Sequence, residues 1–185
     1  MRKLKLQVQM TVDGYIAGPN GEMDWMAWDW DDALKNYVTA ITAPVDCIIL
    51  GRKLAQGFIP HWAANPEREG ADKMNNTAKV VFTKTLDKSE WPNTVLAKGN
   101  LVDEITQLKK QPANDIIVYG GANFVSALIK EGLIDEYHLF INPTAIGNGM
   151  TIFKEIDGKL NLVLVKSTSF ACGIVVLHYE PKRNQ

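Results

Sequence analysis

Cysteine and histidine are scarce in this chain. Its two cysteines, Cys47 and Cys172, lie far apart and beside strand-like sequence, which favours free thiols, buried or half-buried, over a disulfide or a metal pair. The three histidines, His61, His138 and His178, show no spacing typical of metal ligands. The sequence therefore predicts no metal site and gives each histidine a structural or surface position.

Long apolar runs and long runs of one charge are absent too. No apolar stretch approaches the roughly 20 residues of a membrane span, and polar residues interrupt the chain start where a signal peptide has its apolar core. The 20 Lys and Arg residues and the 21 Asp and Glu residues leave a net charge of −1, without a basic stripe. We therefore expect a cytoplasmic protein whose partners are small molecules, with neither nucleic acid nor membrane among them.

The composition that remains is that of an ordinary globular protein. The chain has 185 residues, of which 46% are hydrophobic and 22% charged, and this fits one domain with a substantial core. We expect a single domain over residues 1–180 and a disordered tail over residues 181–185.

Apolar periodicity predicts alternating strands and helices. Strands are predicted over 4–10, 45–50, 79–84, 94–97, 115–119, 136–141, 160–170 and 174–180. Helices are predicted from a cap at Asp29 to Pro44, over 65–75, from a cap at Asn100 to Pro112, and from 122 to Gly132. Residues 13–21, rich in glycine, are expected to form a long, mobile loop, and residues 58–62 an irregular aromatic stretch.

Strand and helix alternate up to Gly132, which is typical of a parallel sheet, and the last two strands form an antiparallel hairpin. The predicted fold class is therefore α/β, with a mixed, mainly parallel sheet of about eight strands, helices on both faces and a C-terminal hairpin.

Glycine or cationic residues lie at the carboxyl ends of three predicted strands. In open α/β sheets, ligands bind at these strand ends. The three segments are Gly51-Arg52-Lys53, Thr83-Lys84 and Gly120-Gly121. Glycine lets the backbone approach a ligand, and a helix start favours an anion. Gly120-Gly121 alone fits a plain chain reversal equally well, but three such ends along one edge indicate a ligand with several phosphates, such as a dinucleotide.

The cations favour NADPH over NADH as that ligand. An added ribose phosphate calls for Arg or Lys, and Arg52, Lys53 and Lys84 are available. Each cation taken singly is also typical of a solvated surface.

An ordered set of motifs resembles the dihydrofolate-reductase-like family, and within it the reductase domain of bifunctional riboflavin-biosynthesis proteins. The motifs are TVDGYIA at 11–17, DW at 24–25, GRK at 51–53, VYGG at 118–121 and PTAIGNG at 143–149. The resemblance spans nearly the whole chain. It implies an NADPH-dependent reductase, often dimeric, so we expect a homodimer.

The resemblance also implies roles for individual residues. The residues that would contact the cofactor phosphates and pyrophosphate are Gly51, Arg52, Lys53, Thr83, Lys84, Tyr119, Gly120, Gly121, Ala122, Asn123 and Phe124. Ile16 and Ala17 resemble the residues that touch the nicotinamide ring, and Trp25 resembles the tryptophan that closes the substrate pocket. Trp28 and Trp30 fit a core cluster better.

The candidate proton donors are Asp31 and Asp24. Dihydrofolate reductases use a carboxylate on the first helix, and with Asp29 as cap only Asp31 lies at the edge of the apolar stripe. A solvated first-turn carboxylate is the alternative for Asp31. Asp24, beside Trp25, is an equal rival. Hydride transfer itself needs only alignment of donor and acceptor carbons.

The sequence thus predicts an NADPH-dependent reductase of a small heterocyclic substrate, either a pyrimidine like a riboflavin precursor or a pterin or folate. The alternative is a non-catalytic nucleotide- or small-molecule-binding protein that keeps the same fold.

Overall fold

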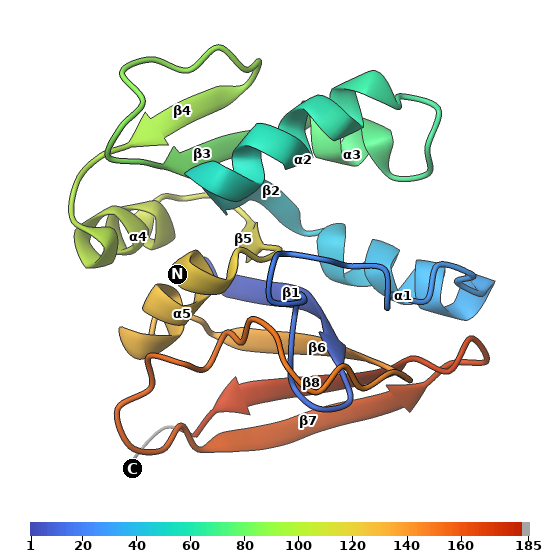
Figure 1. Cartoon of the computed structure of the whole chain (residues 1–185). Coiled ribbons are helices and arrows are strands. Elements are labelled where there is room, and N and C mark those ends of the chain that lie inside the picture. Colours follow the sequence, from blue (N-terminus) through green and yellow to red (C-terminus); the bar gives the residue numbers. More distant parts are fainter. Residues whose placement is uncertain (183–185) are drawn as a thin grey trace.

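A single eight-stranded sheet forms the centre of the protein, seen here in a computed structural model that describes residues 1–182 (Figure 1). The strands are β1 (Leu4–Thr11), β2 (Val45–Gly51), β3 (Ala78–Phe82), β4 (Thr94–Ala97), β5 (Asp115–Val118), β6 (Glu136–Asn142), β7 (Leu162–Ser169) and β8 (Val175–Pro181). The helices are α1 (Asp32–Thr42), α2 (Arg52–Ala64), α3 (Ala71–Asn76), α4 (Leu101–Lys110) and α5 (Ala122–Lys130). None of these described helices has the length and apolar character that crossing a membrane requires.

The strand order is β4-β3-β2-β5-β1-β6-β8-β7. Strands from β4 to β6 pair in parallel, whereas β8 runs antiparallel to both β6 and β7. This is the mixed, mainly parallel sheet with a terminal hairpin that the sequence predicts, and the predicted fold class is confirmed.

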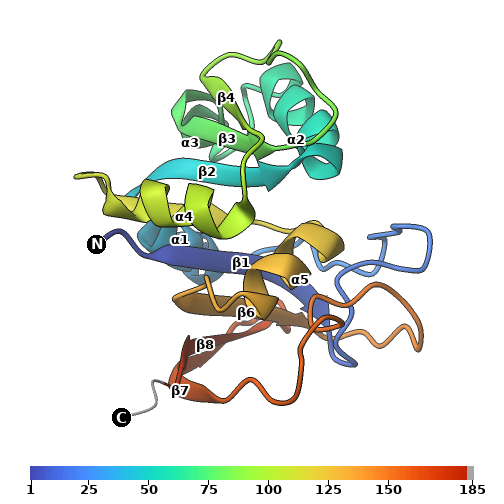
Figure 2. The same cartoon turned by 90° about the vertical axis from the view of Figure 1, so that its left-hand side faces the viewer.

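Helices cover both faces of the sheet (Figure 2). α4 and α5 pack on one face, where Ile105 and Val125 join the largest apolar cluster. α2 and α3 cover the other face near β2 and β3, and α1 covers it near β6 and β8, where Leu34 packs with Phe140. The connections through α1, α2 and α3 lead along the sheet towards β4, whereas those through α4 and α5 lead back towards β6. Because parallel strands are joined by right-handed connections, the two groups of helices lie on opposite faces.

The aromatic stretch 58–62 is helical, contrary to the irregular structure expected of it. It lies inside α2, with Ile59 buried and the Phe58 and Trp62 rings 6.2 Å apart, one helical turn from each other. Pro60 lies within the helix on its exposed side. Burial of the apolar face therefore outweighs the backbone hydrogen bond that proline cannot donate.

Two other expectations are corrected. The surface helix predicted over 65–75 is shorter, and α3 begins only after Gly70, which has a φ of +84°. The predicted tail begins later than residue 181, because Pro181 ends β8 and the Lys182 N–H donates to the Asn161 carbonyl over 2.9 Å. The rest of the predicted tail, 183–185, lies outside the described residues.

Candidate cofactor site

Two helices begin next to each other at the carboxyl edge of the sheet. Gly51 ends β2 and is the N-cap of α2, and Gly121 follows β5 and is the N-cap of α5. Neither glycine offers a side chain to the first N–H groups of its helix. Because β2 and β5 are neighbours, the two sets of unpaired N–H groups lie close together and form a positively polarised edge.

The first turns of α2 and α5 contact each other across this edge. A Cβ atom at Gly51 would lie 3.0 Å from the Cβ of Phe124, and one at Gly121 would lie 3.9 Å from the Cβ of Leu54. Gly121 also has a φ of +84°, a conformation that residues with a side chain rarely adopt. The backbone conformation therefore requires glycine at Gly121, and a side chain at Gly51 would press against Phe124.

The pairing of β1 with β5 ends just before Gly120 and Gly121. β1 pairs with β5 only as far as Leu6 and Val118, whereas its pairing with β6 continues to Thr11. The outer half of β1 therefore has no strand on the β5 side within the described chain. Ligands of open α/β sheets bind at positions of this kind, at the carboxyl ends of the strands.

The loop after β1 is held in place, in contrast to the mobile loop expected there. The Asp13 carboxylate accepts hydrogen bonds from the N–H groups of Ile146 and Gly147. A hydrogen bond with the Thr11 side chain, followed by these two backbone bonds, lowers the pKa of Asp13. Ile16 donates its N–H to the Met150 carbonyl over 2.8 Å.

The same loop is tied to residues 142–150 at two further points. The Met150 N–H donates to the Ala17 carbonyl over 2.8 Å, and the Ala27 N–H donates to the Asn142 side-chain oxygen over 2.9 Å. A Cβ at Gly149 would lie 2.2 Å from the Ala17 oxygen, so only glycine fits. Ile16 and Ala17, predicted nicotinamide contacts, thus belong to a buried, two-sided backbone pairing.

Arg52 and Lys53 are the cations available at the helix starts. Arg52 is half-buried and Lys53 exposed, and neither side chain makes a hydrogen bond or ion pair among residues 1–182. Both follow Gly51 directly. Their charges are therefore free to meet an anion at the edge formed by α2 and α5.

Thr83 and Lys84 lie at the same edge, beyond β3, but their side chains serve the local structure. The Thr83 hydroxyl accepts hydrogen bonds from the N–H groups of Thr85 and Leu86, each over 3.1 Å. The Lys84 ammonium donates to the carbonyls of Lys98 and Gly99 over 2.7 and 2.9 Å. Lys84 keeps one N–H for a ligand, since an ammonium has three.

A hollow of about 340 Å³ opens beside this segment. Gln56 of α2 lines one side, and residues 85–88, 90 and 91, including Leu86 and Trp91, line the other. No local pattern in the sequence indicates this hollow, because its lining comes from two segments that the fold brings together.

Three predicted contact residues turn their side chains to other partners. Tyr119 stacks on Phe58 with ring centroids 5.5 Å apart, and burial raises the pKa of its phenol. Asn123 accepts a hydrogen bond from Lys154, and the Phe124 ring packs 5.1 Å from that of Phe82. For Tyr119 the ring face is therefore used by the packing against α2.

The helix cap predicted at Asp29 is wrong, and Asp31 holds that position. One Asp31 oxygen accepts the Leu34 N–H and the other accepts the Ala171 N–H, each over 2.8 Å. The bond from Leu34, with that from Ala171, lowers the pKa of Asp31, so the group is ionised and occupied. These contacts are unfavourable for the proton donor that the sequence suggested. Asp24 is exposed in the loop.

The tryptophans before α1 differ in their surroundings. Trp25, the predicted substrate contact, is buried and donates its ring N–H to the Glu22 carbonyl over 3.2 Å. Trp30 packs on Phe140 as expected of a core residue, whereas Trp28 is 68% exposed, which corrects its expected place in the core.

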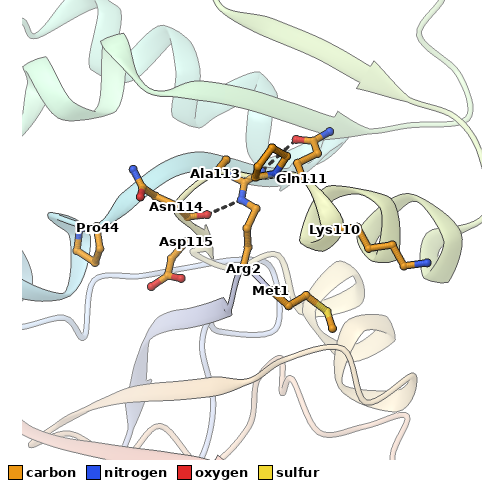
Figure 3. A pocket seen from close by; sticks show the side chains of 9 residues that line it. Met1, Arg2, Pro44, Lys110, Gln111, Ala113, Asn114 and Asp115 are labelled. Atoms are coloured by element: carbon orange, nitrogen blue, oxygen red, sulfur yellow. Dashed lines mark hydrogen bonds between the residues drawn. The ribbon is translucent and has the colours of Figure 1, made fainter.

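A second hollow, of about 400 Å³, lies at the opposite, amino-terminal edge of the sheet (Figure 3). Arg2 occupies its floor, and its guanidinium contacts Asp46, the side chain of Gln111 and the carbonyls of Leu108 and Asn114. These partners already use the donors of Arg2. The hollow is therefore a structural junction between the chain start and the turn before β5.

The mixed sheet with its paired helix starts is a fold of the dihydrofolate-reductase type. The chain belongs to the RibD C-terminal domain family, whose model matches residues 2–176. It is 32% identical over 182 residues to the uncharacterized protein YyaP of Bacillus subtilis, covering 96% of this chain and 94% of that protein. It is 25% identical to the riboflavin biosynthesis protein RibD of Corynebacterium ammoniagenes, covering 80% of this chain but only 44% of that protein.

Solved structures share the fold. A putative riboflavin biosynthesis protein from Shewanella sp. PV-4 superposes with a TM-score of 0.76 at 22% identity, covering 99% of this chain and 100% of that one. Dihydrofolate reductase from Enterococcus faecalis, complexed with NADP(H), gives a TM-score of 0.65 at 18% identity, covering 98% of this chain and 97% of that one. The dihydrofolate-reductase-like fold inferred from the motifs is confirmed.

Proposed function

We propose that this protein is an NADPH-dependent oxidoreductase that transfers hydride to a small heterocyclic substrate. The observation that carries the proposal is the pair of helix starts at Gly51 and Gly121, which contact each other at neighbouring strand ends and lack side-chain caps. Family membership supports the reductase class, and the complex of the Enterococcus enzyme supports the choice of cofactor.

The residues present fit a dinucleotide phosphate. The N–H groups at the starts of α2 and α5 would hold the pyrophosphate, because unpaired amides and helix dipoles favour an anion there. The absence of a side chain at Gly121, which is half-buried, lets a ligand approach the backbone there. Arg52 and Lys53 would neutralise the ribose phosphate, with Lys84 and the hollow beside Gln56 on the adenosine side.

NADPH, when bound, supplies the hydride. Ile16 and Ala17 would support the nicotinamide ring from the paired loop beside the open half of β1, and Trp25 would close the substrate side and exclude water. The loop contacts of Asp13 and Gly149 keep this support rigid, and alignment of donor and acceptor carbons is the main requirement of the reaction. Asp24 is the carboxylate we propose for proton supply.

We propose a pyrimidine of the riboflavin-precursor type as substrate, with a pterin as the second candidate of the same class. The names of the RibD relatives support the first, although the chain spans less than half of the Corynebacterium protein. We also propose a homodimer that acts in the cytoplasm.

Turnover assays test the catalytic part of the proposal. Purified protein with NADPH and a panel of amino-pyrimidines and reduced or oxidised pterins should consume NADPH with one of them, seen as loss of its near-ultraviolet absorbance. Transfer of deuterium from labelled NADPH to the product would identify the acceptor carbon. Binding of NADPH without oxidation by any member of the panel would favour the non-catalytic alternative.

A further inference from the structure

A cluster of buried ionisable side chains lies on the α1 face of the sheet, away from the cofactor edge. Glu136 and His138 point to this face from β6, and His178 does so from β8, where it is directly opposite His138 in the antiparallel pairing. Glu136 and His138 are buried, and His178 is half-buried. The two histidines are far apart in the sequence, so their spacing gave no sign that strand register would place them together.

The distances within the cluster suit three ligands of one metal ion. One ligand atom from each of the three side chains lies within 4.8 Å of the others, and His138 Nε2 is 3.4 Å from Glu136 Oε2. The imidazole rings of His138 and His178 stack with centroids 4.2 Å apart. Ligands of tetrahedral Zn²⁺ are separated by about 3.3 Å, given bonds of about 2.0–2.1 Å, so the three ligand atoms lie within reach of one ion. One of the two imidazole rings would have to turn out of the stack for both lone pairs to meet that ion.

The surroundings of both histidines support this arrangement. The Tyr37 hydroxyl lies 2.8 Å from His138 Nδ1, which orients the ring and leaves Nε2 towards Glu136. Metal-bound histidines have an outer hydrogen bond of this kind. His178 Nε2 is buried and has no hydrogen-bond partner within residues 1–182, a costly state that a metal bond would relieve.

Two lysines limit the negative charge of the cluster without occupying it. Lys3 bonds Glu136 through Oε1 over 2.5 Å, the oxygen that is not shared with His138. Lys5 is 3.9 Å from Glu136 Oε2 but only 2.9 Å from Asp115, its main partner. Oε2 is therefore left to His138 Nε2, 3.4 Å away, and a metal ion would take the place of the proton between these two atoms. The nearby positive charge reduces the affinity for a cation.

We propose that Glu136, His138 and His178 form a binding site for a divalent transition metal, Zn²⁺ above all. Two imidazoles and a carboxylate are ligands that Zn²⁺ favours, whereas Mg²⁺ and Ca²⁺ prefer oxygen alone. The ion would join β6 to β8 and so stabilise the terminal hairpin on the parallel part of the sheet. The site is independent of the proposed reductase activity.

Metal titration of the chelator-treated full chain tests the proposal. Zn²⁺ should raise the melting temperature in a saturable manner, as any ligand of the folded state does, and Mg²⁺ should not. Co²⁺ should bind in place of Zn²⁺ and give visible absorption bands of a low-coordinate site. The absence of a Zn²⁺-dependent shift in the unmodified protein would overturn the proposal.

Variants locate the site. His178→Ala should abolish the Zn²⁺ shift and the Co²⁺ bands, while His61→Ala, which removes an exposed histidine on α2, should keep both. Tyr37→Phe should weaken Zn²⁺ binding about tenfold or more through the lost outer hydrogen bond. A full response in His178→Ala would show that Zn²⁺ binds elsewhere. If His178→Ala fails to fold, the Co²⁺ affinity of Tyr37→Phe decides: a value unchanged from that of the unmodified protein would overturn the proposal.

Discussion

At the scale of single residues, Gly121 is the position on which the cofactor site most depends. Its φ of +84° allows no larger residue without strain. The backbone there must also approach the phosphates for the proposed binding to occur. A side chain at position 121 should therefore leave the protein folded and still prevent it from binding the cofactor.

The variant Gly121→Val should fold but lose measurable NADPH binding. The expected cost to stability is roughly 1–2 kcal/mol from the left-handed backbone. Gly57→Ala is the matched control: Gly57 lies in α2 with open space around its Cβ position, so this change should keep NADPH binding and gain about 0.5–1 kcal/mol of stability. Circular dichroism and calorimetric titration measure both properties. Unchanged NADPH affinity in Gly121→Val would show that the turn is purely structural.

Asp31 provides a pH-dependent contribution to stability. Its pKa is lowered below the ordinary value of 3.8, chiefly by the Leu34 N–H, so the folded state binds the proton more weakly than the unfolded state. The stabilisation is complete above that ordinary pKa and is lost as the pH falls from there through the lower pKa of the folded state.

The variant Asp31→Ala should therefore melt a few degrees below the unmodified protein near neutral pH, because the cap and the bond to Ala171 are lost. The two melting curves should converge in acid below the ordinary pKa of Asp31. Asp29→Ala is the control, since Asp29 is exposed and accepts no hydrogen bond among residues 1–182. A difference that stays constant down to the most acid pH would contradict the assigned role.

Among the elements, the pairing of the loop after β1 with the segment around Met150 gives the site its rigidity. The sequence indicated a loop from its glycine content, but its hydrogen bonds to residues 142–150 come from parts of the chain that no local pattern connects. Gly149 is an example. Glycine is required there because a Cβ atom would collide with the Ala17 carbonyl oxygen, and this contact exists only in the folded chain.

The variant Gly149→Ala should displace this pairing, since its Cβ would overlap the Ala17 oxygen at 2.2 Å. We expect a loss of roughly 1–3 kcal/mol in the free energy of unfolding, the usual cost of forced overpacking. NADPH affinity should fall as well, through the displaced Ile16 and Ala17. Asn148→Ala, a change at the exposed neighbour, should leave both unchanged. Chemical denaturation and titration of the two variants provide the comparison.

Element prediction succeeded where local pattern and packing agree, and failed where they conflict. The strands followed from apolar alternation, and the cap of α4 from Asn100, whose side chain accepts the N–H groups of Val102 and Asp103. Residues 58–62 were expected to be irregular, yet they are helical because the buried face of α2 outweighs the backbone donor that Pro60 lacks. The cap of α1 was placed two residues early, because both aspartates suit the position by residue type. The structure distinguishes them, since Asp31 accepts the N–H groups of Leu34 and Ala171.

For the whole molecule, the order of strands decides which of the predicted residues can act together. The sequence predicted three ligand-suited strand ends, and the sheet places β3, β2 and β5 side by side with all three ends at one edge. Contacts between Gly51 and Phe124, or between His138 and His178, depend on the register of distant segments and could not be predicted from local patterns. The family resemblance was therefore enough to predict the fold, whereas the contacts within the site could be described only from the structure.

The outer edge of the sheet is where we expect the homodimer to form. β7 is the last strand in the order, and Val163, Leu164 and Val165 on it are each about half exposed, at 50%, 51% and 51%. Such an apolar edge favours association. Leu164→Lys should convert a dimer to a monomer in sedimentation velocity, and Val95→Lys, on the edge strand β4 at the other side, should not. A monomeric unmodified protein at high concentration would rule out this interface.

The central claim is that the paired helix starts, with Arg52 and Lys53, bind NADPH. Titration of the protein with NADPH and with NADH, followed by quenching of tryptophan fluorescence, tests it directly. We predict saturable binding of NADPH, tighter than that of NADH by about tenfold or more, as expected of hydrogen bonds to a charged phosphate. Arg52→Gln should remove most of that difference, while Lys130→Gln at the far end of α5 should keep it. Binding of neither nucleotide, or equal binding of both, would contradict the account.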